Sequence, residues 1–423
     1  MSATLPASLW RNPDFLRLWI AQSVSQTGSA VTMVALPLIC VVHLQATPQQ
    51  MGLLMAAESA PLLLLRVPAA AWADASSKRI PVMVACNLLC ALLIAAIPLA
   101  WFFGVLRFWL VLGVGLGMSA TSAVGGMFAA PAVPRIVAVN QLVDANGKFS
   151  VTRSIADVSG RSLAGVLINL ASAPVAMVVD AVSFLVAAAL TWRVQMPPEE
   201  SRHPSEEDTG LWNLTRGFSL LAERPLLGAG VGMAACLCLA NGMVSALVVL
   251  YMARDLAFSA SLIGFLMALG SVGGITAGLL VSPLQRRLGL RGTISLAVTL
   301  LTCSFVLLPF AQPGWLGVVA CVTYDLLGSF GAPLLIITIF SEVPNQVPPH
   351  TIARVMAAIT LVPEAAAMIG ALLGGFLGTA VGIPRTLGIS LAFAVLSNAA
   401  LLLVRRLSQR RGSLQAHPKN AGT

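Results

Sequence analysis

The chain has 423 residues, of which 57% are hydrophobic and 10% are charged, and its formal net charge is +9. A soluble globular protein carries about a quarter charged residues, so this composition excludes an ordinary water-soluble domain. The apolar residues are grouped in runs of about 20 or more, the length that a helix needs to cross the hydrocarbon core of a bilayer. We therefore expect an all-α membrane protein with many spans.

Twelve membrane-spanning helices are predicted, in two groups of six that flank a polar segment. The first 15 residues contain no apolar run followed by a small-residue cleavage site, so we expect no removable signal peptide. The predicted spans, in chain order, are 16–43, 50–74, 80–103, 107–133, 141–170, 173–193, 225–253, 259–284, 290–311, 314–342, 350–380 and 383–404. The corresponding domains are an amino-terminal six-helix half (1–193), a cytoplasmic linker (194–224), a carboxy-terminal six-helix half (225–404) and a basic cytoplasmic tail (405–423).

Lysine and arginine are distributed unevenly between the two sides of the predicted bundle. Of the 25 Lys and Arg residues, 19 lie in the terminal and even-numbered connections with their adjoining helix ends, and three lie in the opposite connections. Positive charge marks the cytoplasmic side of a membrane protein, so we expect both termini in the cytoplasm. We expect this positive charge to contact anionic lipid of the bilayer and not nucleic acid.

The two groups of spans end in similar loops. AAAWADASSKR ends the second span and GLLVSPLQRR ends the eighth. At an offset of 208 residues, Asp74 aligns with Ser282, and the basic pair at 78–79 aligns with the basic pair at 286–287. Two six-helix halves with matching loops indicate a two-lobed secondary transporter.

Four apolar segments carry a recognisable pattern. They are NPDFLRLWIAQSVSQTGSAVTMVALPL in span one, AAESAPLLLLRVPAAAWADASSKRIPV through span two, VVDAVSFLVAAAL in span six and ARVMAAITLVPEAAAMIGALLGG in span eleven. With them, residues 10–405 resemble the major facilitator superfamily of transporters. More narrowly, the chain resembles the bacterial efflux branch that includes macrolide exporters and enterobactin-type siderophore exporters. The resemblance implies the major facilitator fold, a monomer in the bacterial inner (plasma) membrane and a small-molecule substrate.

The loop between spans two and three is similar to the superfamily pattern Gly-x-x-x-Asp-Arg-x-x-Arg-Arg. Asp74, Lys78 and Arg79 match it, while Ala70 and Ala75 stand where the pattern has glycine and arginine. In the family this loop latches the cytoplasmic side, with its Asp facing the start of span eleven. The free N–H groups and dipole at the start of that helix would attract a carboxylate. The resemblance therefore implies a gating loop, and the alternative is a set of solvated loop charges.

Eight ionisable residues fall at membrane depth. An ionised side chain that faces lipid at the centre of a span costs about 2.5–3.5 kcal/mol, so we expect these residues to face a cavity or one another. They are Glu58, Arg66, Arg153, Asp157, Arg161, Asp180, Asp325 and Glu364.

The densest charges lie in span five, where Arg153, Asp157 and Arg161 are spaced by four residues and form one stripe of a helix. Asp157 can bridge both arginines, and Glu58 or Asp180 could supply the remaining negative charge. One interpretation is a structural network that fixes helix packing. The other is that the stripe lines a central cavity, where Arg161, with Arg153, would attract a carboxylate, hydroxamate or phosphate of the substrate. Asp157 or Glu58 would then carry the proton that drives transport.

Two carboxylates of the second half are open to more than one interpretation. Glu364 follows Pro363 near the middle of span eleven, where it could pair with Arg153, take up a proton alone or remain neutral. Asp325 follows Tyr324 in span ten and is equally ambiguous.

Span five departs from the drug–proton antiporters of the superfamily. Those transporters carry a Gly-Pro pair there, whereas this chain reads GRSLAG, with Arg161 at the position of the proline. An exposed arginine repels lipophilic cations, so the departure favours a polar or anionic solute.

Other chemistries leave no motif in the sequence. His43, His203, His350 and His417 lack metal-ligand spacing, so we expect no metal site. No GxxxxGK[ST] motif is present, so ATP is not expected to be the direct energy source, and no nucleophile–base constellation suggests an enzyme. All seven cysteines lie inside apolar runs and are expected to be buried. We expect no cofactor and a proton gradient as the driving force.

The sequence thus leads to one function and two alternatives. The first is a proton-coupled exporter (antiporter) of a small polar or anionic organic molecule, such as a siderophore or secondary metabolite, with direction and cargo implied by the resemblance. The second is a proton-coupled importer of an organic anion or a peptide-like solute. The third, of a different class, is a transporter-like membrane sensor, which would be expected to carry an ordered signalling domain.

Overall fold

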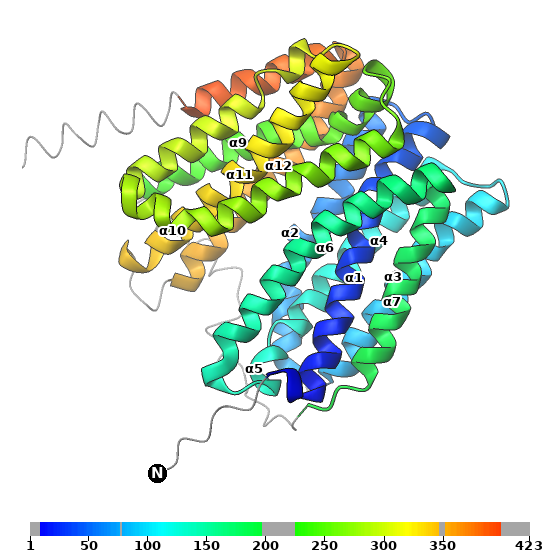
Figure 1. Ribbon diagram of the computed structural model, residues 1–423, viewed down its shortest axis with the longest axis vertical. Coiled ribbons are helices and arrows are strands. Elements are labelled where there is room, and N and C mark those ends of the chain that lie inside the picture. Colours follow the sequence, from blue (N-terminus) through cyan, green and yellow to red (C-terminus); the bar gives the residue numbers. More distant parts are fainter. Residues whose placement is uncertain (1–8, 77, 197–224, 347–351, 399–423) are drawn as a thin grey trace, which may run out of the picture.

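Two bundles of long helices lie side by side in the computed structural model, which describes residues 9–76, 78–196, 225–346 and 352–398 (Figure 1). Most of the predicted linker and the whole predicted tail lie outside these residues. The amino-terminal half contains α1 (Pro13–Leu38), α2 (Pro48–Ala75), α3 (Arg79–Phe102), α4 (Phe108–Ala129), the short α5 (Val133–Ile136), α6 (Leu142–Leu170) and α7 (Ala173–Trp192). The carboxy-terminal half contains α9 (Pro225–Leu250), α10 (Ala260–Ser304), α11 (Trp315–Gln346), α12 (Ile352–Ala380) and the helical residues 383–398.

The described residues are helical at each of the twelve predicted spans, which confirms the predicted fold class. Spans eight and nine form one continuous element, α10, which kinks at Gly289, where φ is +65°. By length and composition alone, nine helices of the described part could cross a membrane. The difference from twelve arises because α10 counts once, the charged α6 is not apolar enough, and the last helix is described only over 383–398.

Short polar signals start several of these helices. Asn12 caps α1 by accepting hydrogen bonds from the backbone N–H groups of Asp14 and Phe15. Thr47 and Gln50 form a capping box at α2, in which each side chain accepts a hydrogen bond from the other residue's backbone. These caps satisfy N–H groups that have no partner inside the helix, and they fix where each span begins.

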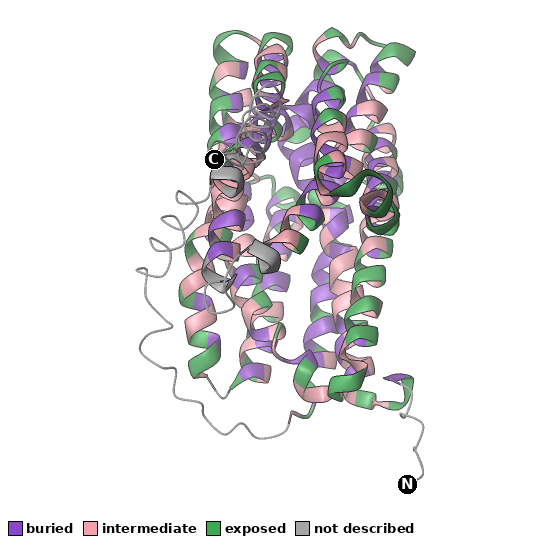
Figure 2. Cartoon of the chain, turned by 90° about the vertical axis from the view of Figure 1, so that its left-hand side faces the viewer, coloured by how far each residue is buried: buried purple, intermediate pink, exposed green. Residues whose placement is uncertain are grey.

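The outer surface of the bundle is suited to lipid. Large apolar side chains remain exposed along it, with Leu64 at 70%, Leu92 at 69% and Leu279 at 73% exposure. In Figure 2, exposed residues alternate with buried ones along the long helices, so many helices have one face buried and another exposed. An exposed apolar surface over this many helices is stable in a bilayer and not in water.

The ends of α1 and α9 repeat the same unusual turn. Each helix passes into a π-helical segment, Ile39–His43 in one half and Tyr251–Asp255 in the other, 212 residues further on. A non-glycine residue with positive φ follows each, Gln45 at 51° and Ala257 at 54°, again 212 apart. Side-chain-bearing residues rarely adopt this conformation, so its recurrence shows that the halves share one backbone design. The offset of 208 between the basic pairs at 78–79 and 286–287 is four smaller, so span eight reaches its basic pair about one helical turn sooner than span two does.

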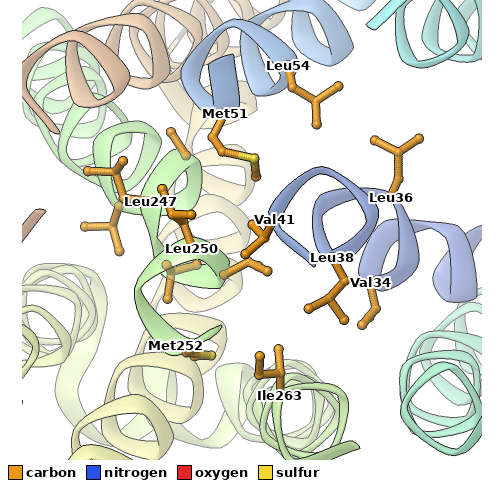
Figure 3. Packing of buried hydrophobic residues seen from close by; sticks show 14 of the residues in the cluster. Val34, Leu36, Leu38, Val41, Met51, Leu54, Leu247, Leu250, Met252 and Ile263 are labelled. Atoms are coloured by element: carbon orange, nitrogen blue, oxygen red, sulfur yellow. The ribbon is translucent and has the colours of Figure 1, made fainter. Parts of the chain in front are cut away.

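The halves contact each other closely at the end of the bundle remote from the N-terminus, which we call the junction end (Figure 1). There the backbone N–H of Gln49 donates to Thr379 Oγ1 at 3.1 Å. The Arg254 guanidinium donates to the Val41 carbonyl at 3.4 Å and to Gln45 Oε1 at 3.3 Å. One buried apolar cluster continues through both halves at this end; Figure 3 shows side chains of α1, α2, α9 and α10 meeting there.

The most extensive contacts between the halves are made by two pairs of helices: α2 packs on α12, and α6 packs on α10. We call these contacts the α2–α12 seam and the α6–α10 seam. A Cβ added at Gly52 would lie 2.8 Å from the Cα of Gly375, and one added at Gly264 would lie 2.7 Å from the Cα of Gly165. Gly52 and Gly264 are equivalent in the internal repeat. At each seam the two backbones therefore approach so closely that only glycine fits between them.

Candidate transport site

The charged stripe of α6 lies at the α6–α10 seam. Arg161 Nε donates to Asp157 Oδ1 at 2.9 Å, and Ser271 Oγ, from α10, donates to Asp157 Oδ2 at 2.7 Å. Both carboxylate oxygens of Asp157 are therefore engaged, one within the helix and one across the seam. The predicted bridge from Asp157 to both arginines is half formed, because Arg153 makes no ion pair within the part of the chain that the structure describes.

A carboxylate of α11 completes the charges around Arg161. Arg161 and Asp325 interact electrostatically. Gly270, next to Ser271, brings α10 against α11 at this level, since a Cβ added there would lie 2.6 Å from the Cβ of Asp325. Asp157, Arg161, Ser271 and Asp325 thus form one group, which we call the α6–α10 cluster. Asp325 thus supplies negative charge near Arg161, where the sequence suggested Glu58 or Asp180, but among the described residues no hydrogen bond or ion pair joins Asp325 to Arg161.

The α2–α12 seam carries its own ion pair. Arg66 Nη1 lies 3.3 Å from Glu364 Oε1, and the two side chains are 39% and 33% exposed. Oε2 of Glu364 is buried and has no hydrogen-bond partner among the described residues. Of the alternatives left open for Glu364, the structure therefore shows a pair, but with Arg66 and not with Arg153. Each seam thus joins the halves through an acidic side chain at membrane depth.

Two predicted acids lie away from both seams. Asp180 is fully buried between α1 and α7, where Thr32 and Ser183 donate hydrogen bonds to its carboxylate. Gly28 allows this approach, because a Cβ added there would clash with Asp180 and Ser183. Glu58 of α2 lies against Gly115 of α4, and its carboxylate has no ion pair or hydrogen bond among the described residues. We interpret Asp180 as a packing residue of the first half.

The predicted gating loop lies at the end of α2. Asp74 and Lys78 are exposed, whereas Arg79 is buried at the start of α3. Of their predicted contact, the start of span eleven at residues 347–356, the first part (347–351) lies outside the described residues. The latch therefore stays a prediction.

A cavity inside the first half, lined by apolar and polar side chains, was not predicted from the sequence. It has a volume of about 640 Å³ and lies where α1 and α4 face each other, with α3, α6 and α7 completing its walls. Its polar lining comes from several helices. Gln22, Gln26, Asn87, Ser122, Asn146 and Arg153 contribute to it. Small uncharged polar residues in apolar helices are the signal that could have revealed it. We call it the amino-half cavity.

Thiols and metal ligands add little to the site. Cys86 and Cys90 of α3 line the amino-half cavity, and the seven cysteines are free thiols. Within the described ranges, no three His, Cys, Asp or Glu side chains gather where they could hold a metal ion.

Comparisons with known proteins agree on family and fold. The family model described as Major Facilitator Superfamily matches residues 18–363 and 230–422. No curated protein sequence matches the chain significantly. The structure is similar to that of the nucleoside transporter NupG, with a TM-score of 0.78, 13% identity, and coverage of 92% of this chain and 98% of that one.

Two inward-facing structures are also similar. One is a bacterial homolog of the human lysosomal transporter Spinster, unoccupied, with a TM-score of 0.68, 16% identity, and coverage of 98% and 100% of the two chains. The other is a bacterial homologue of the iron transporter ferroportin, with a TM-score of 0.71, 19% identity, and coverage of 94% and 99%. At these identities the likeness shows the fold alone.

Proposed function

Because the chain belongs to the Major Facilitator Superfamily, we propose that this transporter is a proton-coupled exporter of a small polar or anionic organic molecule, such as a siderophore or secondary metabolite. It acts in the bacterial inner membrane as a monomer, without ATP or a cofactor, with both termini in the cytoplasm. The gating loop at Asp74, Lys78 and Arg79 then lies on the cytoplasmic side.

The observation that carries the proposal is that each seam holds an acid at membrane depth. Asp157 contacts Ser271 across the α6–α10 seam, and Glu364 contacts Arg66 across the α2–α12 seam. The side chains of Asp157 and Glu364 are 36% and 33% exposed, so protons can reach both. A buried structural network would leave neither acid accessible.

A proton on either acid changes the contact between the halves. Protonation of Glu364 turns its ion pair with Arg66 into a hydrogen bond between a charged guanidinium and an uncharged carboxyl group, and protonation of Asp157 does the same to its pair with Arg161. A hydrogen bond to a charged group contributes about 1.5–3 kcal/mol, and less where water screens it. Each 1.4 kcal/mol corresponds to roughly a tenfold change in an equilibrium, so protonation can bias the halves between two arrangements.

One geometric feature favours the alternative, an importer of an organic anion or peptide-like solute. Arg153 lies one helical turn from Asp157, about 6 Å along the axis of α6. An anion bound by Arg153 would repel the ionised form of Asp157 and favour its protonated form, so cargo and proton would bind together, as in symport. The sensor alternative gains no support from the described residues.

Comparison of metabolites inside and outside cells tests the direction of transport. Untargeted mass spectrometry on cytosol and spent medium would compare cells that lack the protein, the parent strain and cells with the protein restored. We expect one metabolite class to accumulate in the cytosol of the deficient cells and to vanish from their medium, and restoration to reverse both changes. A metabolite left unconsumed in the medium would contradict export and support import.

A further inference from the structure

We infer that Glu58 and Asp325 are a matched pair of proton-binding acids, one in each half of the protein, and that both hold a proton while the junction end is closed. The inference rests on the proton-coupled transport proposed above, and it adds one proton site per half to the acids of the seams. Asp157 and Glu364 connect the two halves, whereas Glu58 and Asp325 each lie between two helices of the same half.

The internal repeat relates the sites of the two acids. A Cβ added at Gly115 of α4 would lie 3.5 Å from the Cγ of Glu58, and one added at Gly270 of α10 would lie 2.6 Å from the Cβ of Asp325. Gly270 follows Glu58 by 212 residues, which is the offset of the two π-helical segments, and Asp325 follows Gly115 by 210. The same site in each half therefore holds one acid against one glycine, but the acid lies on opposite walls.

This exchange of walls keeps one carboxyl group per half at the same depth. Glu58 lies six residues along α2 from Gly52, and Gly270 lies six residues along α10 from Gly264, so both sites are about 9 Å from the glycine contact of a seam. An ionisable side chain inside a membrane span is costly, and a site that served only packing could have a small apolar residue on each wall. An acid in both halves, supplied by different helices, favours a function that needs the carboxyl group itself.

Neither carboxyl group has the partners that an ionised acid needs. The side chains of Glu58 and Asp325 make no hydrogen bond or ion pair among the described residues, and Oδ2 of Asp325 is buried. Asp157 and Asp180, by contrast, each accept two hydrogen bonds from other side chains. A carboxylate that leaves water without a partner is far more costly than an uncharged carboxyl group, so Glu58 and Asp325 keep their protons.

The groups around each acid are compatible with an exchangeable proton. Both side chains are only partly buried, so water can reach them. Arg161 attracts the ionised form of Asp325, but its Nε is held by Asp157 and makes no bond to Asp325. The other titratable groups that interact with the two acids are uncharged at neutral pH. They are Cys40 near Glu58, and Cys321 and Tyr324 near Asp325.

Infrared difference spectroscopy tests whether the two acids hold protons. An uncharged carboxyl group absorbs at a higher frequency than a carboxylate does, and its band shifts when water is replaced by D₂O. The full-length protein in lipid nanodiscs would be measured at neutral pH, without cargo and without a gradient. Subtracting the spectrum of a variant from that of the unchanged protein isolates the band of the replaced acid, so bands of other acids cancel.

Glu58→Gln and Asp325→Asn should each remove one carboxyl band, and the double variant should remove both. Asp144→Asn is the matched control and should remove none, because Asp144 is exposed, pairs with Lys148 and is ionised at neutral pH. Alkaline pH should abolish both bands reversibly while the protein remains folded. A proton held for packing alone would stay in place, so this step separates a proton-exchanging acid from a structural one.

Two results would overturn the inference. One is a difference spectrum without a carboxyl band for either variant, which would show that the replaced acid is ionised. The other is a pair of bands that persist at alkaline pH in the folded protein, which would make both acids structural. The measurement requires no transport. Exchangeable protons on both acids of a protein that moves no cargo would refute the transport proposal and leave the two sites, whereas proton-coupled transport with both acids ionised would do the reverse.

Discussion

Asp157→Asn is expected to reduce transport to the level of cells that lack the protein, with the amount of protein in the membrane unchanged. Asparagine keeps the shape of the side chain, and its amide can still accept from Arg161 and donate to Ser271, so the contacts at 2.9 and 2.7 Å can persist. The change removes only the charge and the ability to bind a proton. The loss would be measured as intracellular cargo accumulation, alongside immunodetection of the protein in membranes.

The matched control for this change is Asp144→Asn. Asp144 lies on the same helix, is exposed and pairs with Lys148 four residues further on. We expect its replacement to leave transport unchanged, because surface pairs of this kind contribute little. If Asp157→Asn transports normally, Asp157 is a structural residue, and Glu364→Gln and Glu58→Gln become the variants that identify the proton site.

Gly52→Val is expected to prevent the junction end from closing and so to abolish transport. A Cβ at this position would lie 2.5 Å from the Ala371 carbonyl oxygen and 2.8 Å from the Cα of Gly375, both on the backbone of α12. A backbone contact cannot relax by rotating a side chain, so the α2–α12 seam must separate. Gly264→Val should have the same effect at the α6–α10 seam, since its Cβ would meet the backbone of Gly165.

A cysteine reporter at the junction end measures this separation. Leu250 is fully buried in the cluster that joins the halves, and Leu250→Cys places a thiol there. In this background, Gly52→Val should raise labelling by a membrane-impermeant maleimide by roughly tenfold or more, because opening would expose a site that is otherwise inaccessible. Gly113→Val is the control, as a Cβ at Gly113 of α4 meets nothing within 4 Å. Unchanged labelling together with normal transport would show that glycine contacts do not hold this end closed.

The helices and their charges could be predicted because the signals are local. Runs of apolar residues set the spans, the predicted boundary between spans eight and nine (284–290) contains the kink of α10 at Gly289, and spacing by four residues predicts the pair between Asp157 and Arg161. All of these signals lie within one helix or one turn. The family pattern adds the two-lobed arrangement, which the turns at Gln45 and Ala257 express in the backbone.

The contacts between the halves could not be predicted from local signals. Ser271 carries no charge and lies 114 residues from Asp157, so its hydrogen bond depends on the register of α10 against α6. The pair between Arg66 and Glu364 depends in the same way on how α2 meets α12. The amino-half cavity depends on polar side chains from different helices, none of which is unusual by itself. Local patterns therefore predicted which residues carry the charge, and the packing of the halves decided which of them meet.

Proton movement driven by cargo tests the central claim most directly. Inside-out vesicles would be given a pH gradient with an acidic interior. An acridine dye reports this gradient, because its fluorescence is quenched when the interior is acidic. The cargo identified from the metabolite comparison would then be added outside the vesicles. An exporter that exchanges cargo for protons would carry protons out of the vesicle, so we predict recovery of fluorescence with the unchanged protein and none with Asp157→Asn. Deeper quenching would show that cargo and proton move together, and no response at all would show that transport is not coupled to protons; either result would contradict the account.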